Sequence, residues 1–469
     1  MFDFVLLISV LAPSTLSVSP SYNGLGKTPQ MGWNNWNAFA CDVSEDLLLG
    51  TSEKIVKWGL KDLGYNYVIL DDCWSEGRNS SDYLIPDSKK FPRGMKHVAD
   101  SLHDEGLLFG MYSSAGEYTC AGYPGSLGHE EADAASFASW DVDYLKYDNC
   151  YNQGNYGTAQ LSYERYKAMS DALNKTGRPI YYTLCNWGED SPWHWASAIA
   201  NSWRISGDIY ADFDRPDSRC PCNGDEYYCH LAGFHCSIMN ILNKAAPLGQ
   251  KAGPGGWNDL DALEVGVGNM TDEEEKTHFS MWAAVKSPLV IGANLNTLDA
   301  KSFSIYVNPA IIAVNQDAAG TPVMRVWRYY VSDTDEHGQG EIQLWSGPLD
   351  NGDQIVALLN AGCKDRSMNA TLEDIFIDSG ADSEKLSSSW AIYDLWANRL
   401  DGDTAKDIIN GNSTAKGKLY NATELPYTEG IAKNDTRLFG TKVGTVKPFG
   451  SIETVVPPHG VAFYRLRQE

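Results

Sequence analysis

Acidic, amide and indole side chains stand at the ends of short apolar runs in the first two thirds of this sequence. The run YVILDDCW at 67–74 carries Asp71 and Asp72, and YLKYDNC at 144–150 carries Lys146 and Asp148. Residues two apart in a β-strand point to the same face, so Lys146 and Asp148 share a face. A Lys and an Asp on a buried face are costly unless they are paired or used. Taken alone, the run fits a structural ion pair or a catalytic pair.

Six further runs recur along the same part of the chain. Seven of the eight end in polar, charged or aromatic residues, among them Trp36, Tyr112, Cys185, Asn186, Trp187, Arg204, Asp208, Asp259 and Asp261. The six runs are MGWNNW (31–36), FGMYSS (109–114), IYYTLCNW (180–187), SWRISGD (202–208), GGWNDLD (255–261) and SPLVIGA (287–293).

This set of residue types suits a sugar. Carboxylates and amides bind hydroxyls, and indoles stack on the apolar face of a pyranose. The sequence has no G-x-G-x-x-G after the first run and no P-loop, and it lacks a G-x-S-x-G elbow. Histidine is scarce at the run ends, so the remaining chemistry is a pair of carboxylates, as in glycoside hydrolysis. We expect no cofactor and no metal.

The stretches between the runs read as helices, which gives eight βα units. Helices are predicted over 44–63, 163–173 and 273–285, the last with Thr271 as its N-cap. Eight such units predict a (β/α)8 TIM barrel, an α/β fold in which the carboxyl ends of all strands meet at one rim. The run-end residues would converge there.

The pattern changes after about Gly320. Strands separated by turn signals are predicted over 324–331, 342–346, 354–359, 389–394 and 460–466, with few helices between them. We therefore expect a signal peptide at 1–17, the catalytic barrel at 18–320, and a C-terminal antiparallel β-sandwich at 321–469 that packs directly on the barrel.

Composition and charge narrow the class of partner. The chain has 469 residues and a net charge of −24, which argues against nucleic acid or an anionic membrane as partner. Residues 1–17 have a short apolar core and small residues at Thr15 and Ser17, as a secretory signal does, although Asp3 replaces the usual basic residue. A buried N-terminal strand is the alternative. Secretion to the extracellular or cell-wall space is expected, and the oligomeric state is left open.

Ten cysteines in such a chain favour disulfides. The cluster Cys220, Cys222, Cys229 and Cys236 would also permit zinc, although Cys-Pro-Cys is a poor match to the usual ligand spacing. Seven N-x-S/T sequons predict exposed, glycosylated segments at Asn79, Asn174, Asn269, Asn369, Asn412, Asn421 and Asn434.

The motifs GLGKTPQMGWNNW, ILDDCW, GMYSSAGEYTCAGYPGS, YLKYDNC, LCNW, WRISGD and GGWNDLD resemble those of the α-galactosidases (melibiases) of glycoside hydrolase family 27, especially the secreted yeast enzymes. The resemblance runs from about Tyr22 into the C-terminal domain. It implies a retaining double displacement on melibiose-like or raffinose-type galactosides, with Asp148 as nucleophile and Asp208 as acid/base. The two carboxyl groups of a retaining pair stand about 5–5.5 Å apart.

The resemblance also implies a substrate pocket. Asp71 and Asp72 would bind the galactose 4- and 6-hydroxyls, Trp36 would form a wall, and Lys146 and Arg204 would hold the hydroxyls near C2 and C3. Tyr112, Cys120, Asn186 and Asp261 would complete the pocket. The implied disulfides are Cys41–Cys73, Cys120–Cys150, Cys220–Cys236 and Cys222–Cys229, which leaves Cys185 and Cys363 free.

Two alternatives stay open at this point. An α-N-acetylgalactosaminidase of the same family needs room beside the sugar 2-position, and the large indole of Trp187 argues against it. A galactose-binding protein without catalysis is the other alternative, and the presence of both carboxylates with their cation partners argues against that one.

Overall fold

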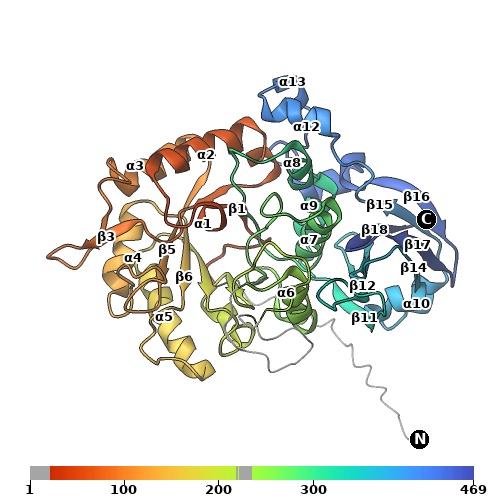
Figure 1. Cartoon of the computed structure of the whole chain (residues 1–469), viewed down its shortest axis with the longest axis horizontal. Coiled ribbons are helices and arrows are strands. Elements are labelled where there is room, and N and C mark those ends of the chain that lie inside the picture. Colours follow the sequence, from red (N-terminus) through yellow and green to blue (C-terminus); the bar gives the residue numbers. More distant parts are fainter. Residues whose placement is uncertain (1–21, 218–219, 221–234) are drawn as a thin grey trace, which may run out of the picture.

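Eight parallel strands form the centre of the N-terminal part of the chain (Figure 1). The computed structural model describes residues 22–217, 220 and 235–469. The strands follow the order β10-β1-β2-β5-β6-β7-β8-β9, and Leu263, just beyond β9, closes the ring through a parallel bridge to Ile291 of β10. The predicted (β/α)8 barrel is confirmed. Its strands are β1 (Met31–Asn34), β2 (Tyr67–Ile69), β5 (Leu108–Ser114), β6 (Tyr144–Asp148), β7 (Tyr181–Cys185), β8 (Ser202–Arg204), β9 (Trp257–Asp259) and β10 (Leu289–Ile291).

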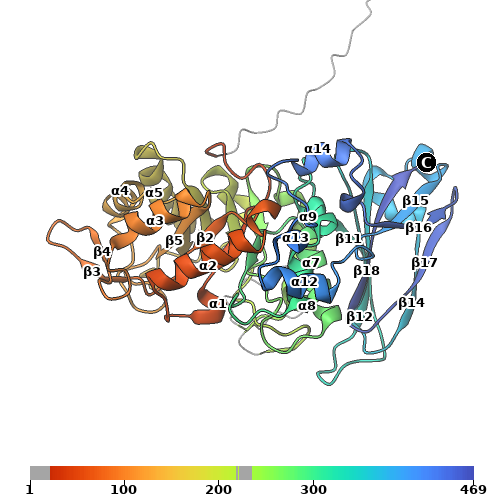
Figure 2. The ribbon, with the colours of Figure 1, turned by 90° about the horizontal axis from the view of Figure 1, so that it is seen from above.

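Helices surround this barrel (Figures 1 and 2). The predicted N-cap Thr271 opens α7 with a capping box, in which Thr271 and Glu274 each bond the other's backbone N–H. The helix predicted over 44–63 ends earlier, at Lys57, because Gly59 takes a left-handed conformation (φ 79°). The barrel helices are α1 (Trp36–Phe39), α2 (Glu45–Lys57), α3 (Gly94–Asp104), α4 (Glu130–Ser139), α5 (Ala159–Lys175), α6 (Ile238–Ala245), α7 (Asp272–Ala284), α8 (Ala300–Tyr306) and α9 (Pro309–Asn315).

An apolar layer closes the barrel interior below the carboxyl ends of its strands. Ile69, Tyr144 and Tyr181 form one buried cluster, against which Tyr67 and Val290 pack. The rings of Tyr144 and Tyr181 are stacked, with centroids 5.4 Å apart. The barrel is therefore filled rather than open, and polar side chains gather above this layer.

The C-terminal part is an antiparallel β-sandwich, as predicted. A six-stranded sheet has the order β11-β12-β13-β18-β15-β16, and a two-stranded sheet pairs β14 with β17 (Figure 2). Five of these strands lie where the sequence predicts them. The strands are β11 (Met324–Tyr330), β12 (Glu341–Pro348), β13 (Gln354–Asn360), β14 (Arg366–Thr371), β15 (Trp390–Asp394), β16 (Thr441–Val446), β17 (Ser451–Val456) and β18 (Gly460–Gln468).

Sequence patterns miss several short elements. A hairpin follows β2, and three strands and five helices of the C-terminal domain have no clear periodicity because each is short or half exposed. In β14, for example, only Met368 and Ala370 are buried. The missed elements are β3 (Ser75–Arg78), β4 (Leu84–Pro86), β14, β16, β17, α10 (Leu372–Ile375), α11 (Ser383–Leu386), α12 (Gly402–Ile409), α13 (Ser413–Lys416) and α14 (Tyr427–Ala432).

The two domains pack directly against each other. Helix α7 lies against β18, and Trp396 of the C-terminal domain donates from Nε1 to Ser280 Oγ at 2.9 Å. Arg399 forms an ion pair with Asp272 at 2.8 Å. One hydrophobic core runs from the barrel through Trp396 to Phe463 of β18. Burial across this boundary joins the domains into one core.

The described part of the chain holds three disulfides, Cys41–Cys73, Cys120–Cys150 and Cys220–Cys236, while its Cys185 and Cys363 are free thiols. Because Cys220 and Cys236 form a disulfide, neither can act as a thiolate ligand of zinc. Cys222, Cys229 and residues 1–17 lie outside the described residues. Within the described ranges, no helix is long and apolar enough to cross a membrane. Six of the seven sequon asparagines are exposed, and Asn421 is only partly so because its Oδ1 accepts from the N–H groups of Thr423 and Glu424.

Candidate active site

A cavity of about 790 Å³ opens at the carboxyl ends of the barrel strands. Ten of the twelve residues predicted for catalysis or substrate binding line it. Its size is in the range of roughly 300–1,000 Å³ that is usual for small-molecule sites. The ten residues are Trp36, Asp71, Asp72, Tyr112, Cys120, Lys146, Asp148, Arg204, Asp208 and Asp261.

Asp148 ends β6 and is 6% exposed. Tyr112 on the neighbouring strand β5 donates from its hydroxyl to Asp148 Oδ2 at 2.9 Å, and the Asn149 backbone N–H donates to Oδ1 at 2.9 Å. Burial raises the pKa of Asp148 to about 6, although the charge of Lys146 and these hydrogen bonds lower it. Desolvation is therefore the larger effect on Asp148, and the charge of Lys146 acts against it.

Lys146 has a different direct partner from the one the strand spacing suggested. Its Nζ lies 2.7 Å from Asp71 Oδ2, which also accepts from Asn34 Nδ2 at 2.8 Å. Lys146 also lies over the ring of Tyr112, 5.4 Å from its centroid. Asp72 accepts from the Ala121 backbone N–H at 2.9 Å. Asp71, Asp72 and Lys146 thus form a fixed set of donors and acceptors on one side of the cavity.

Arg204 organises the opposite side of the cavity. Its Nη2 lies 3.0 Å from Asp208 Oδ1 and 2.7 Å from Asp261 Oδ2. The Asp208 side chain is about half exposed (51%), but it lies inside a cavity whose walls remove it from bulk water. That desolvation raises the pKa of Asp208, with Arg204 acting against it and Asp261 adding to it. A carboxyl group with a raised pKa can hold a proton for transfer.

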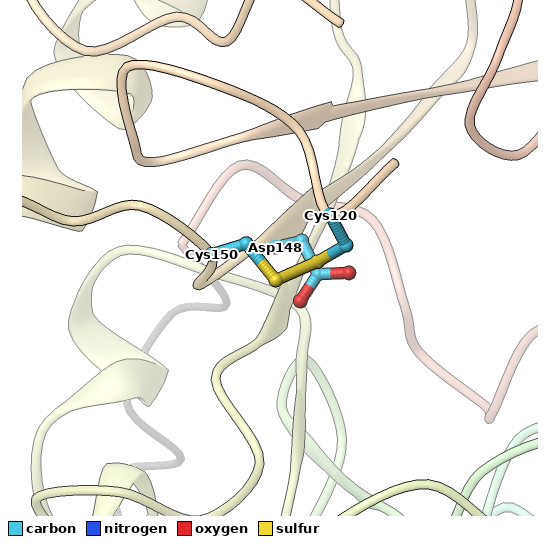
Figure 3. Close-up of side chains that lie close together, drawn as sticks. All are labelled: Cys120, Asp148 and Cys150. Atoms are coloured by element: carbon cyan, nitrogen blue, oxygen red, sulfur yellow. A yellow bond between two sulfur atoms is a disulfide. The ribbon is translucent and has the colours of Figure 1, made fainter. Parts of the chain in front are cut away.

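The Cys120–Cys150 disulfide lies against the carboxylate of Asp148 (Figure 3). It joins the loop after β5 to the loop after β6. Asp148 is the last residue of β6, so it directly precedes the second of these loops. Cys120, Asp148 and Cys150 bring three potential metal-binding atoms within 4.8 Å of one another. Both thiols are consumed in the disulfide, so this cluster provides a rigid rim rather than thiolate ligands.

Comparison with known proteins decides the family. The family description "Alpha galactosidase A" matches residues 28–317, and "Alpha galactosidase C-terminal beta sandwich domain" matches residues 339–418. An alpha-galactosidase of Torulaspora delbrueckii is 68% identical over 471 residues, covering 100% of this chain and 99% of that protein. This chain belongs to the α-galactosidase (melibiase) family.

Solved α-galactosidase structures share the whole fold. The alpha-galactosidase of Saccharomyces cerevisiae superposes with a TM-score of 0.95 at 69% identity, covering 96% of this chain and 100% of that one. A second structure of the S. cerevisiae enzyme, determined with raffinose, gives the same values. The family predicted from the seven sequence motifs is confirmed, as is the class of enzyme, a glycoside hydrolase.

Two of the predicted site residues do not line the cavity. Asn186 is fully buried and donates from Nδ2 to the Glu189 carbonyl at 2.8 Å. Trp187 follows with a left-handed backbone (φ 58°). The indole of Trp187 is outside the cavity lining, so the argument that it excludes a 2-acetamido group does not hold in this α-galactosidase fold.

Other cavity residues were missed. Asn37 and Glu264 lie beside Trp36 and Asp261, and each is within three positions of a predicted residue, so local spacing could have indicated them. The C-terminal domain contributes Glu336, His337 and His459, for which the sequence carries no signal, because only packing of the domains brings them to the barrel.

Proposed function

We propose that this protein hydrolyses terminal α-D-galactosyl residues of melibiose-like and raffinose-type galactosides by a retaining double displacement. The observation that carries the proposal is the convergence of Asp148 and Asp208 on one cavity, each beside a cationic side chain that is itself paired. The names of the relatives support the galactoside substrate, and the raffinose bound by the S. cerevisiae enzyme supports the oligosaccharide class.

Asp148 is the nucleophile in this proposal. Its carboxylate accepts from the Tyr112 hydroxyl and from a backbone N–H, and both bonds stabilise the ionised form. Asp208 accepts from Arg204 and shares that cation with Asp261. The proposal places the single proton of the pair on Asp208, whose pKa is raised by desolvation and by the charge of Asp261, and the apparent pKa values belong to the pair.

The reaction then has two steps. In the first, an Asp148 oxygen attacks C1 of galactose, the bond from C1 to the leaving oxygen breaks, and Asp208 donates its proton to that oxygen. In the second, the Asp208 carboxylate takes a proton from water, the water oxygen attacks C1, and the bond to Asp148 breaks. Two inversions at C1 give net retention.

Recognition of galactose falls to the remaining cavity residues. Asp71 and Asp72 accept hydrogen bonds from the 4- and 6-hydroxyls, Lys146 and Arg204 together donate to the ring hydroxyls near C2 and C3, and Trp36 provides an apolar wall. The hydrogen bonds that already fix Asp71 and Asp72 support this assignment, since preorganised partners lose little freedom on binding. We further propose that residues 1–17 direct secretion, which the three disulfides support.

The decisive experiment pairs substitution with product analysis. Hydrolysis of melibiose followed by NMR should release α-galactose first, since retention preserves the anomer. Asp148→Gly should abolish hydrolysis of a nitrophenyl α-galactoside, and added azide should restore leaving-group release by forming β-galactosyl azide.

Asp104→Asn provides the control, because Asp104 is an exposed carboxylate at the end of α3. It should match the wild-type rate. Near-wild-type hydrolysis by Asp148→Gly without azide would overturn the nucleophile assignment, and β-galactose as the first product would overturn retention.

A further inference from the structure

A second, smaller cavity lies inside the barrel, next to the active site. It measures about 30 Å³, and we call it the inner cavity. Ile69, Tyr144 and Val290, which belong to the apolar layer of the barrel interior, form part of its wall. The residues that line it are Asn34, Asn37, Ile69, Tyr144, Lys146, Thr183, Cys185, Arg204, Asp259, Asp261, Ala262 and Val290.

Arg204 lines both cavities and is 3% exposed. Its Nη2 donates to Asp208, Asp261 and the Ser206 carbonyl, and its Nη1 donates to the Cys185 sulfur at 3.5 Å. Its Nε, in contrast, is buried without a hydrogen-bond partner among the described residues. An unpaired buried donor on a charged group is costly, so a partner is expected.

Asp259 faces Arg204 across the strand pair. The two residues are register partners on β8 and β9, so their side chains share the inner face of the barrel. The Asp259 carboxylate accepts from the Asp261 backbone N–H through Oδ1 at 2.8 Å. Its Oδ2 takes part in no hydrogen bond within the described ranges, and no ion pair joins it directly to Arg204. The acceptor Asp259 Oδ2 and the donor Arg204 Nε thus belong to two residues that line the inner cavity without a direct hydrogen bond between them.

We propose that the inner cavity holds an ordered water that accepts from Arg204 Nε–H and donates to Asp259 Oδ2, which makes Asp259 a positioning residue for the active site. The volume is sufficient, because one water needs roughly 10–15 Å³ and two to four polar partners. Lys146 and Thr183, which also line the cavity, can supply the further partners.

The water would fix Arg204 from its inner side. Arg204 in turn bonds Asp208 and Asp261 at the surface of the active site, so Asp259 acts on the proposed acid/base without touching substrate. This inference rests on the proposed function, because it assigns Asp259 a part in setting the protonation of Asp208. A bridging water is nearly as favourable as a direct hydrogen bond.

Two substitutions of Asp259 separate this role from a general structural one. Asp259→Asn keeps the acceptor for the Asp261 backbone N–H but places an NH2 group where Oδ2 was, whereas Asp259→Leu has similar bulk and no acceptor at all. We expect Asp259→Leu to lower kcat roughly 10- to 100-fold, since small misplacements of catalytic groups have effects of that size. Because Arg204 lowers the pKa of Asp208, loosening Arg204 should also move the basic limb of the kcat/KM profile to higher pH. Asp259→Asn, which keeps the Asp261 bond and loses only the acceptor for the water, should lower kcat and move the limb in the same direction, and wild-type behaviour of this variant would overturn the proposal.

Ile69→Val is the matched control, because it enlarges the inner cavity from its apolar wall and removes no polar partner. Its rate and pH profile should equal those of wild type. A high-resolution crystal structure of the wild-type protein should show a water within hydrogen-bond distance of Arg204 Nε and Asp259 Oδ2, and an empty inner cavity would overturn the proposal. Equal pH profiles for Asp259→Leu and wild type would also overturn it. If wild type itself fails to hydrolyse α-galactosides, the proposed function is what fails.

Discussion

Lys146 Nζ lies 2.7 Å from Asp71, which follows the end of β2, rather than pairing directly with Asp148 two residues along its own strand. The pair is buried, with side chains 17% and 3% exposed. Lys146 therefore connects the residues proposed to bind galactose hydroxyls with the proposed nucleophile, on which its charge still acts.

Breaking the Lys146–Asp71 pair from one side should be strongly destabilising. Lys146→Met leaves the Asp71 carboxylate buried without its cation, which costs about 3–5 kcal/mol for pairs of this kind. Asp71→Asn leaves the Lys146 ammonium buried without its carboxylate partner, with a similar cost. The double variant should lose less stability than the two single losses added together, with a coupling of about 1–3 kcal/mol in urea unfolding. The exposed pair Lys175–Glu131 is the control, and its cycle should give less than about 1 kcal/mol. Additive losses at Lys146 and Asp71 would contradict the pairing.

Tyr112→Phe should move the acidic limb of the kcat/KM profile to higher pH. The Tyr112 hydroxyl bonds Asp148 and lowers its pKa, so removing that hydroxyl raises the pH at which the nucleophile ionises. A hydrogen bond to a charged group is worth about 1.5–3 kcal/mol, or roughly one to two pH units. Tyr147→Phe is the matched control, since the Tyr147 hydroxyl is buried with no partner in the described part of the chain. Identical shifts in both variants would refute the role of Tyr112.

Removal of the Cys120–Cys150 disulfide should affect both stability and catalysis. Replacing both cysteines by serine frees a loop closed across 30 residues, and such a change costs about 3 kcal/mol. Because the disulfide lies against Asp148, kcat should fall as well, as steady-state kinetics on a nitrophenyl galactoside would record. Cys363→Ser, at an exposed free thiol, should change neither quantity. Full activity with reduced stability would mean that the disulfide supports the fold alone.

Glu264→Gln should flatten the dependence of stability on pH. Burial raises the pKa of Glu264 to about 8, whereas the unfolded chain has a value near 4.5. Between these values the folded state keeps a proton that the unfolded state has lost, so wild-type stability falls as pH rises, by up to about 1.4 kcal/mol per pH unit. Gln cannot ionise, so the variant should gain on wild type as pH rises. Thermal unfolding at several pH values would measure this, with the exposed Glu424→Gln as control.

The fold and much of the site could be predicted because parallel strands place their carboxyl ends at one rim. That rule brings Asp71, Asp148, Asp208 and Asp261 to one cavity from four separate runs. The rule did not hold for Asn186 and Trp187, which do not line the cavity. Asn186 donates to the Glu189 carbonyl and Trp187 adopts a positive φ, so the chain turns away from the cavity there. A local turn of this kind leaves no periodic pattern in the sequence.

The sequence could not predict the ion-pair partner of Lys146 or the contacts between the domains. The spacing of Lys146 and Asp148 suggests a pair, but the choice of Asp71 depends on side-chain directions in three dimensions. His459 lies just before β18 and reaches the cavity where β18 packs against α7, whereas His337 comes from the segment between β11 and β12. Their approach is a property of tertiary structure that no local signal encodes.

The continuous core between the domains limits how this enzyme can be made smaller. A chain cut after α9 would expose the apolar surface that Trp396 and Phe463 now cover, and it would lose Glu336, His337 and His459 from the cavity wall. The barrel alone would then be both prone to aggregate and altered in the substrates it accepts. Minimisation or circular permutation should therefore keep both domains and use exposed segments such as the turn between β3 and β4.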